Sequence, residues 1–328
     1  MSDEFRYEYF SSVKQKDVDW LWYPYIPYGK LTVLQGDPGE GKSTFMLNTA
    51  ALLTRGKPMP DGFPISGPQT VVYQCSEDDV ADTIKPRLIA AGADCDRIAY
   101  IVETTTSLTL EDARIEKVIQ ETGARLVVLD PIQAFLPQDG DMQSASRMRS
   151  ILGRLADIAE KYNCAVVLIG HMNKGTGGKN LYRSLGSIDI VAIARSVLMI
   201  TRSTAEPDVR YMLPVKSSLA PEGCAIAFSF SADNGFQWIG PCDIGKEDMV
   251  SDGTADDTKR TSAADMLKEM LANEDLPSVD VLKEMSLLGF SRRTVFSAKK
   301  DIQAEAYRKD NAWYWRLAPD REENVNAD

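Results

Sequence analysis

The sequence predicts an α/β fold, in which a large domain with a mostly parallel β-sheet is followed by a small C-terminal domain of helices and paired strands. The first observation is that short apolar runs alternate with helical patterns between residues 21 and 240. This alternation is typical of β-α units joined by right-handed crossovers. The second observation is a polar and acidic stretch over residues 241–260, which interrupts the pattern and is interpreted as a linker.

Five apolar runs in the large domain are interpreted as buried parallel strands, because continuous runs of this length are typical of strands covered on both faces. Helical stretches separate them, and the last carries its apolar residues on one face. Antiparallel strands are expected at 209–216, 224–231 and 236–239, closing the domain near residue 240. The runs lie at 31–35, 70–75, 125–130, 164–170 and 196–201, and the helices at 42–55, 78–91, 111–122 and 144–161.

The chain beyond residue 260 has its own pattern of elements. Helices are expected at 262–272, 278–287 and 292–305, and Ser291 is interpreted as the N-cap of the last one. An aromatic strand pair ending in AWYWRL follows. The predicted organisation is an N-terminal arm at 1–20, a core domain at 21–240, a linker at 241–260, a second domain at 261–318 and a disordered tail at 319–328.

The 328 residues have an ordinary globular composition, with 44% apolar and 26% charged residues. No apolar run approaches the roughly 18 residues of a membrane span, and the N-terminus lacks a secretory signal, so a cytoplasmic protein without membrane contact is expected. Five cysteines without a CxxC pair are expected to be reduced, with the three in apolar runs buried. The formal net charge of −11 implies that any contact with nucleic acid is local.

A glycine-rich loop is the strongest motif in the sequence. Residues 36–43, GDPGEGKS, match the pattern GxxxxGK[ST], and they follow an apolar strand and open a helix, as this motif requires. The glycines let backbone N–H groups close around a phosphate, Lys42 reaches the β- and γ-phosphates, and the Ser43 hydroxyl binds Mg²⁺. ATP and Mg²⁺ are therefore the expected cofactors. The residues expected to bind the nucleotide are Gly36, Asp37, Pro38, Gly39, Glu40, Gly41, Lys42, Ser43 and Thr44.

Two acidic residues after apolar strands are expected to complete the ATP site. Asp130 ends the strand LVVLD, where α/β sheets bind their ligands, and is expected to hold Mg²⁺; the alternative is a turn cap. Glu77 is the candidate base that activates water, and the strand before it, at 70–75, is expected to neighbour the strand that leads into the loop. Asp78 and Asp79 compete for this role, and the acidic cluster is also explained as a helix cap.

The single histidine of the chain, His171, closes the strand at 164–170. A polar side chain at this strand end is expected to hydrogen-bond the γ-phosphate and to transmit its loss to the loop that follows. The alternative is a histidine that only packs in the core or caps the strand.

The segments GDPGEGKST, VVYQCSEDD, LVVLDP and GHMNK…LYRSLGSIDIVAIARSVLMITR together resemble the RecA-like hexameric replicative helicases. The resemblance covers about residues 21–240 and is to the RepA type of plasmid, phage and prophage ATPases, with the DnaB helicase domain as a more distant relative. It implies a RecA-like P-loop NTPase core that assembles into a ring, with a hexamer expected, and that binds ATP between neighbours. The resemblance makes Arg195 the expected arginine finger, and Lys216 matches a lysine supplied across the interface. DnaB-type chains carry an arginine two residues beyond that lysine, where this sequence has Ser218, which favours Arg195 as the finger.

Two loops after strand ends are expected to face nucleic acid in such a ring. The loop after His171 is glycine-rich and carries Lys174, Lys179 and Arg183, which suit contact with the backbone of a single strand. The loop after Asp130 is a weaker candidate, because its two arginines are offset by two aspartates. The alternative is a flexible surface loop with scattered charge.

The C-terminal domain is a second candidate for nucleic-acid contact. Residues 285–318 hold seven basic and three acidic residues, against a net charge of −11 for the whole chain. The order of elements resembles a winged helix-turn-helix, which would place the helix with Arg292, Arg293, Lys299 and Lys300 in a major groove. The Trp-Tyr-Trp strand is expected to pack against the helices, and docking of a protein is the alternative role of this domain.

The sequence thus predicts an ATP- and Mg²⁺-dependent motor on nucleic acid, a DNA helicase in the replication of a plasmid, phage or other mobile element. Single-stranded or forked DNA, further copies of the chain, and a primase or initiator are the expected partners. The alternatives are a recombination or replication mediator or loader, and a DNA-bound regulator that ATP controls without unwinding.

Overall fold

The structure is a computed structural model that describes residues 7–103, 105–136, 145–171, 188–203, 206–231, 234–244, 257–272, 274–290, 292–309 and 312–317. Two compact units make up the chain, one from Met1–Arg202 and Asp208–Cys242, the other from Ser203–Pro207 and Asp243–Asp328. Each unit has its own apolar core and is described by itself. No helix among the described residues has both the length and the apolar character needed to cross a bilayer.

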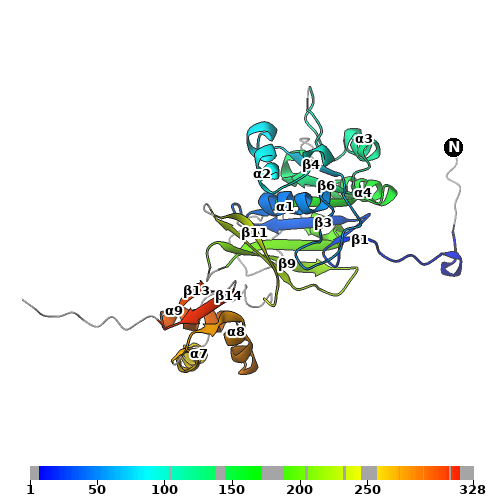
Figure 1. The fold of residues 1–328 in the computed structure, drawn as a ribbon. Helices are drawn as coiled ribbons and strands as arrows, with labels where there is room; N and C mark the ends of the chain where they lie inside the picture. Colours follow the sequence, from blue (N-terminus) through cyan, green and yellow to red (C-terminus); the bar gives the residue numbers. More distant parts are fainter. Residues whose placement is uncertain are drawn as a thin grey trace, which may run out of the picture. The chain divides into compact units, whose positions relative to one another are not determined.

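The first unit is built on a large, mostly parallel sheet, as the sequence predicts (Figure 1). Within the described residues this sheet has nine strands, in the order β11-β10-β9-β8-β3-β7-β6-β4-β5. The strands from β8 to β5 run parallel, and β9, β10 and β11 continue the sheet in antiparallel pairs. Their bounds are β3 (Leu31–Gly36), β4 (Val71–Cys75), β5 (Ile98–Ala99), β6 (Leu126–Asp130), β7 (Ala165–His171), β8 (Ser196–Arg202), β9 (Val209–Ser217), β10 (Ala225–Ser231) and β11 (Gly235–Cys242).

One expectation about the strand order is wrong. The strand that precedes Glu77, β4, does not neighbour β3, because β7 and β6 lie between them. A sequence pattern indicates which strands exist, whereas the packing of the crossover helices decides where each strand enters the sheet. The parallel register still aligns the strand tips, since Gly36 pairs with His171 and Cys75 pairs with Asp130. The residues that follow β3, β4, β6 and β7 therefore emerge at the same edge.

The crossover helices lie close to their expected positions, with one exception. The helix expected at 78–91 begins later, with a short π-helix, η2 (Val80–Ile84), followed by α2 (Lys85–Ala90). The Asp79 carboxylate caps η2 by accepting hydrogen bonds from two backbone N–H groups. The other elements of this unit are α1 (Lys42–Thr54), α3 (Ala113–Thr122), α4 (Ala145–Lys161), α5 (Ile188–Ile193), the strand pair β1 (Trp20–Trp22) and β2 (Ile26–Pro27), and single turns η1 (Phe10–Ser12), η3 (Cys95–Arg97) and η4 (Ile132–Phe135).

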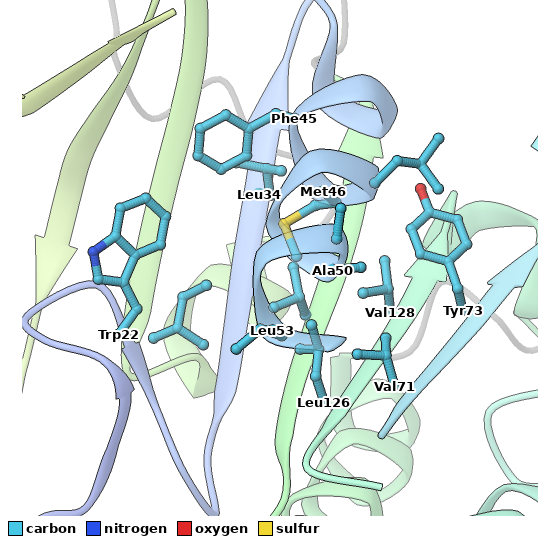
Figure 2. Packing of buried hydrophobic residues seen from close by; sticks show 14 of the residues in the cluster. Trp22, Leu34, Phe45, Met46, Ala50, Leu53, Val71, Tyr73, Leu126 and Val128 are labelled. Atoms are coloured by element: carbon cyan, nitrogen blue, oxygen red, sulfur yellow. The ribbon is translucent and has the colours of Figure 1, made fainter. Parts of the chain in front are cut away.

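Helix α1 is buried on two sides, which holds the loop before it in place. Figure 2 shows Met46 of α1 facing the sheet, where it belongs to the same buried cluster as Val128 of β6. On its other side, the Phe45 ring centroid lies 5.3 Å from that of Phe228 and 5.2 Å from that of Trp238, both on the antiparallel strands. Aromatic contacts of this kind add to the free energy of burial. The N-terminus of α1 is thus fixed from the sheet and from the hairpin β10–β11.

The opposite face of the sheet is covered as well. Val127 and Leu168 point away from α1, yet they are fully buried. Helix α4 contacts β3 and β7, and its residues Ile151, Leu152 and Leu155 are buried. Two covered faces account for the continuous apolar runs of the central strands.

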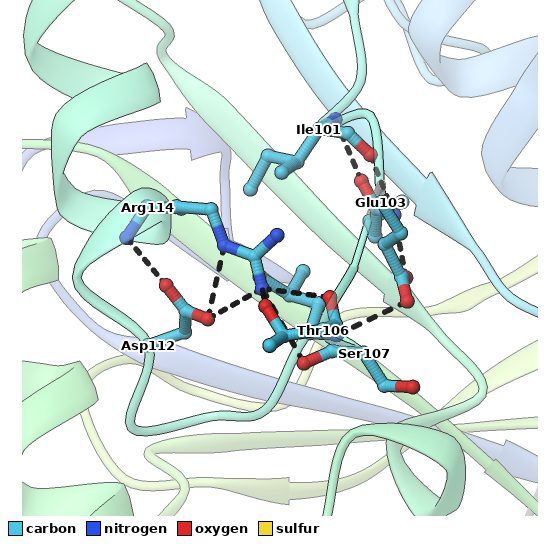
Figure 3. A network of polar contacts seen from close by, with 8 residues as sticks. Ile101, Glu103, Thr106, Ser107, Asp112 and Arg114 are labelled. Atoms are coloured by element: carbon cyan, nitrogen blue, oxygen red, sulfur yellow. Dashed lines mark hydrogen bonds and ion pairs between the residues drawn. The ribbon is translucent and has the colours of Figure 1, made fainter.

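A loop outside β5 is held to the sheet by polar contacts (Figure 3). The Gln74 side chain of β4 accepts a hydrogen bond from the Ile101 N–H at 2.8 Å and donates one to the Ile101 carbonyl at 3.2 Å. The last paired residues of β4 and β5 are Val72 and Ala99, and this side-chain amide continues the connection to Ile101, two residues further along the chain. Arg114 continues the network by donating to Asp112 at 2.6 Å and to the carbonyl oxygen of Thr106 at 3.2 Å. The loop therefore has a defined conformation beside the strand that precedes Glu77.

The cysteines only partly follow the sequence prediction. All five are free, and Cys164 is fully buried as expected. Cys75 is half-buried, and Cys224 is exposed, so the expectation of burial is wrong for Cys224. It lies in the loop before β10, where the Tyr25 hydroxyl donates a hydrogen bond to its carbonyl oxygen at 2.8 Å.

The second unit combines three helices with a three-stranded antiparallel sheet in the order β12-β14-β13, within its described residues. Helix α9 ends at Asp301 instead of residue 305, because Gln303 takes a left-handed conformation (φ 53°) and the chain turns into β13. Ser291, the expected cap of α9, lies outside the described residues. The elements are α7 (Asp257–Leu271), β12 (Leu276–Pro277), α8 (Ser278–Leu287), α9 (Arg292–Asp301), β13 (Glu305–Lys309) and β14 (Ala312–Arg316).

Candidate functional site

The loop between β3 and α1 needs glycine at two positions for different reasons. Gly41, the residue before α1, has φ 88°, a left-handed conformation that other residues adopt only with strain. Gly36 packs directly on the backbone of β8, so that a side chain there would collide with the carbonyl oxygen of Ile200. The first N–H groups of α1 have no partner within the helix and point toward the loop, which favours an anion.

The ammonium group of Lys42 lies inside this loop. Its Nζ donates to the carbonyl oxygen of Gly36 at 2.8 Å and to that of Asp37 at 2.9 Å, and the residue is only 4% exposed. Burial lowers the pKa of Lys42, and the nearby carboxylates of Asp130, Asp37, Glu40 and Glu77 oppose this shift. The lysine is thus a positive charge surrounded by acidic residues, and phosphate oxygens would replace the two carbonyls as its partners.

Ser43 and Asp130 lie side by side, as the sequence predicts for a Mg²⁺ site. Burial raises the pKa of Asp130, while hydrogen bonds from Ser43 and Tyr73 lower it. The Tyr73 hydroxyl donates to Asp130 Oδ2 at 2.7 Å within the core. Tyr73 is not predicted by the sequence as a site residue, because the pattern of β4 does not indicate that β6, which ends in Asp130, is its neighbour.

The acidic residues after β4 have separate roles. Asp79 is the helix cap, and Asp78 Oδ2 accepts from Arg87 Nη1 at 2.8 Å. Glu77 lines the same pocket as Lys42 and Ser43, and neither Asp78 nor Asp79 does. Of the three competing candidates for a base, Glu77 is therefore the one placed at the loop.

A pocket of about 530 Å³ adjoins the loop, a size that suits a nucleotide. One wall is the loop with the start of α1, and another is formed by Arg87 and the residues that end α2. A third wall, which the sequence does not predict, comes from the hairpin β10–β11. The pocket residues on or next to α1 and α2 are Thr44, Leu47, Asn48, Arg87, Ala90 and Ala91. Those of the hairpin are Phe230, Asn234, Gly235 and Phe236.

Two arginines that the sequence does not predict as site residues, Arg202 and Arg210, pack against the loop. Arg202, at the end of β8, donates to the carbonyl oxygen of Gly39 at 3.4 Å. Arg210 of β9 is buried and donates to the carbonyl oxygen of Phe230 at 3.1 Å, and its Cδ would lie 3.5 Å from a Cβ on Gly41. Burial lowers the pKa of Arg210, and the charge of Arg202 adds to this shift. These contacts connect the loop to the hairpin wall of the pocket.

Arg195 and Lys216 lie at the opposite end of β8 from the loop. The Lys216 Nζ donates to the carbonyl oxygens of Val191, Ala192 and Ala194 at 2.9, 3.1 and 2.8 Å, and so caps the end of α5. Arg195 is exposed, and its N–H bonds to the carbonyl oxygen of Leu31, at the start of β3. At roughly 3.3 Å per residue, about 16 Å of strand separates that level from the loop. Neither side chain serves the loop of its own chain.

The remaining candidates are placed only in part. His171 is the last residue of β7 and the register partner of Gly36, but its side chain lies outside the described residues. So do Lys174, Lys179 and Arg183, and the side chain of Arg293. On α9, Lys300 is exposed and Arg292 is half-buried. Lys299 packs its Nζ 4.8 Å from the centroid of the Trp315 ring, and burial lowers its pKa.

The parallel sheet, the glycine-rich loop and the Ser43–Asp130 pair together define a P-loop NTPase with a RecA-like fold. The sequence profile of the AAA domain family matches residues 7–177, just over half of the 328 residues. The chain therefore belongs to the AAA domain family and contains an ATPase domain of this type.

Several relatives with assigned roles match part of the chain. The DNA repair protein RadA of Streptococcus pneumoniae (strain ATCC BAA-255 / R6) is 28% identical over 148 residues, which are 44% of this chain and 31% of RadA. The RadA proteins of Halalkalibacterium halodurans and Bacillus subtilis (strain 168) are 29% and 28% identical over 148 residues, 44% of this chain and 28% of each relative. The match thus spans less than a third of the length of these curated relatives.

Proposed function

We propose that this protein is an ATP-driven motor on DNA, a RepA-like helicase that works in the cytoplasm in the replication of a plasmid, phage or other mobile element. The observation that carries the proposal is the convergence of Lys42, Ser43, Asp130 and Glu77 at one edge of a RecA-like sheet. The similarity to proteins named for DNA repair supports a nucleic acid as the target. A primase or initiator would be a partner in replication.

Each of the four residues has a defined task in the proposed reaction. Lys42 binds the β- and γ-phosphates, and Glu77 orients the attacking water and accepts its proton. The Ser43 hydroxyl and the Asp130 carboxylate would hold Mg²⁺, which prefers oxygen ligands and, when bound, would neutralise charge on the phosphate oxygens. The base and ribose would lie in the part of the pocket between Arg87 and the hairpin β10–β11. Tyr73 is a positioning residue that holds Asp130.

The proposed reaction is completed by a second copy of the chain. Arg195 cannot reach the loop of its own chain, so as an arginine finger it acts on ATP bound by a neighbour in a ring. Lys216 holds α5 in place beside it, in addition to any contact across the interface. His171, at the tip of β7 beside β3, is proposed to sense the γ-phosphate and to move the segment that follows, with Lys174, Lys179 and Arg183, along DNA.

The second unit is proposed to be a winged helix-turn-helix that contacts nucleic acid through α9. Arg292, Arg293 and Lys300 would meet the phosphate backbone, whereas Lys299 packs on Trp315 and contributes less. A deletion of residues 261–328 should therefore weaken DNA binding while the ATPase unit remains folded, since the two units have separate cores.

The proposal is tested by measuring ATP hydrolysis and strand displacement on a forked duplex in the same samples. We expect DNA to stimulate hydrolysis and the fork to be opened only with ATP. The Lys42→Ala variant should lose both activities, which controls for contaminating enzymes. Hydrolysis without any response to DNA would contradict a role on nucleic acid.

A mediator or loader is the second candidate, and the similarity to RadA favours it. Such a protein would hydrolyse ATP in response to DNA without displacing a strand. The forked-duplex assay separates the two, because only a helicase yields free single strands. If a Glu77→Gln variant that binds ATP without hydrolysing it still supports the other activities of the unchanged protein, ATP acts only as a regulator of assembly.

A further inference from the structure

Glu40 lies in the phosphate loop, whose backbone N–H groups are expected to hold the phosphates of a nucleotide. Its side chain is only 18% exposed, and a glycine with a left-handed conformation stands on each side of it, Gly39 (φ 81°) and Gly41 (φ 88°). A carboxylate held against such a loop repels the anion that the loop binds. Contact with a phosphate therefore does not explain this side chain.

Two arginines on neighbouring strands lie next to Glu40. Arg202 of β8 and Arg210 of β9 are register partners, so two like charges extend from the same face of this strand pair. Glu40 Oε1 lies 3.8 Å from Arg202 Nε. Burial and the charge of Arg202 lower the pKa of Arg210, and the charge of Glu40 opposes this shift. One carboxylate is thus shared by two cations beside the loop.

The geometry of this cluster is not that of a stabilising salt bridge. The 3.8 Å between Glu40 and Arg202 is too long for a hydrogen bond. Glu40 Oε2 and Arg210 Nε are both buried, and in the described part of the chain neither atom has a hydrogen-bond partner. Buried polar atoms without partners cost free energy. Stability of the fold therefore does not account for Glu40, whereas an effect of its charge on the loop does.

The charge of Glu40 also reaches the lysine of the loop. Burial lowers the pKa of Lys42, and Glu40 is one of the carboxylates that oppose this shift. Glu40 therefore offsets positive charge on Lys42, Arg202 and Arg210 together. These cations would otherwise add to the attraction of the loop for phosphate.

We propose that Glu40 limits the affinity of the phosphate loop for nucleotide and so speeds the release of ADP after hydrolysis. Its carboxylate repels the β-phosphate and cancels part of the attraction that Arg202 and Arg210 exert. The inference rests on the proposed function, since it concerns the same ATP site. Glu40 acts through its charge and takes no part in breaking the phosphate bond.

The test measures the Kd and the off rate of a fluorescent ADP analogue with the full chain, in EDTA so that the phosphates carry their full charge. Glu40→Gln keeps the size of the side chain and removes its charge. We expect it to tighten ADP binding on the order of 10-fold, mainly through a slower off rate. Glu116→Gln is the matched control: it removes the same charge from a surface pair with Lys161 and should change the Kd by less than about 2-fold.

The charge of the ligand separates repulsion from a change in the shape of the loop. AMP lacks the β-phosphate, so its gain in affinity in Glu40→Gln, measured by displacement of the fluorescent analogue, should be smaller than that of ADP. An equal gain for both ligands would indicate a change of shape and overturn the inference. Unchanged ADP binding would overturn it too, and weaker binding would show that Glu40 only holds the loop in place.

A double-mutant cycle with Arg202→Gln tests the shared charge. We expect this substitution to weaken ADP binding in the unchanged protein and by at least as much in Glu40→Gln, where the arginine is no longer offset. No further effect in Glu40→Gln would show a purely structural pair and contradict the inference. If the unchanged protein binds neither ADP nor ATP, the proposed function fails as well. Thermal melting of each variant excludes loss of folding.

Discussion

The two ends of the parallel strands in the first unit carry different sets of polar residues. At the carboxyl ends, Lys42, Ser43 and Asp130 meet at one loop, and Glu77 joins them. At the amino ends, Arg195 and Lys216 are neighbours, and the phosphate loop of the same chain is out of their reach. One end can therefore bind a nucleotide within a single chain, whereas the cations at the other end can act on a nucleotide only if a second copy presents it.

The largest expected effect comes from removing Arg195, at the amino ends of the strands. Arg195→Ala should lower the rate of ATP hydrolysis by about 10³-fold or more, the usual loss on removing an arginine finger, with little change in nucleotide affinity. The measurement is kcat together with the Kd of a fluorescent ATP analogue. Unchanged kcat would show that Arg195 is only a surface charge.

Mixing two inactive variants sharpens the same point. Arg195→Ala keeps its loop, and Lys42→Ala keeps its arginine, so a mixed assembly contains sites in which both residues are present. Partial recovery of hydrolysis on mixing is expected if the arginine acts between chains. No recovery, in assemblies shown to contain both variants, would contradict a site shared between chains.

The next effect concerns the carboxyl end. Glu77→Gln should lower kcat by about 10²- to 10⁴-fold while nucleotide binding remains, because the amide cannot accept the proton from water. Asp78→Asn is the matched control, since that carboxylate is paired with Arg87 outside the phosphate loop. A larger loss in Asp78→Asn than in Glu77→Gln would exchange the two assignments.

A third prediction concerns pH and Asp130. Burial raises the pKa of this carboxyl in the folded state, so its contribution to stability is present in acid and is lost as the pH rises through the folded pKa. Asp130→Asn should therefore become more stable than the unchanged protein as the pH rises, although hydrolysis falls. The measurement is the free energy of unfolding in urea across the pH range.

Asp112 gives the control of opposite sign. A hydrogen bond from Arg114 lowers the pKa of Asp112, so its contribution is present at neutral pH and is lost as the pH falls through the folded pKa. Asp112→Asn should thus be less stable than the unchanged protein at neutral pH, with the difference shrinking in acid. The same trend in both variants would contradict the two environments described for these carboxylates.

The smallest effect is on folding at the amino end. Lys216→Met should lower the free energy of unfolding by about 1 kcal/mol, because it removes a charged donor from three carbonyl oxygens at the end of α5. Lys30→Met breaks only the exposed pair with Glu160 and should change the free energy of unfolding by less than about 1 kcal/mol, as is usual for exposed ion pairs. If both variants melt alike, the cap on α5 is not a stabilising contact.

The two ends of the sheet also differ in how well the sequence predicts them. Lys42, Ser43 and Asp130 follow from local patterns, because a glycine-rich turn before a helix and an acid after an apolar strand carry their chemistry in a few consecutive residues. The α/β fold and its mostly parallel sheet follow from the alternation of apolar runs in the same way.

What the sequence does not predict depends on contacts between distant segments. Tyr73 meets Asp130 only because β4 pairs with β6, and the neighbour expected for β4 is wrong. Arg210 reaches the phosphate loop from β9, which follows the loop by more than 160 residues in the sequence.

Strand β8 connects the amino end of the sheet, with Arg195, to the phosphate loop at the carboxyl end. Near the carboxyl end of β8, the backbone of Ile200 packs directly against Gly36, with no side chain between them. The strand begins directly after Arg195. If Arg195 acts on the nucleotide of a second copy, as proposed, β8 directly connects one phosphate loop to the site of the neighbouring chain.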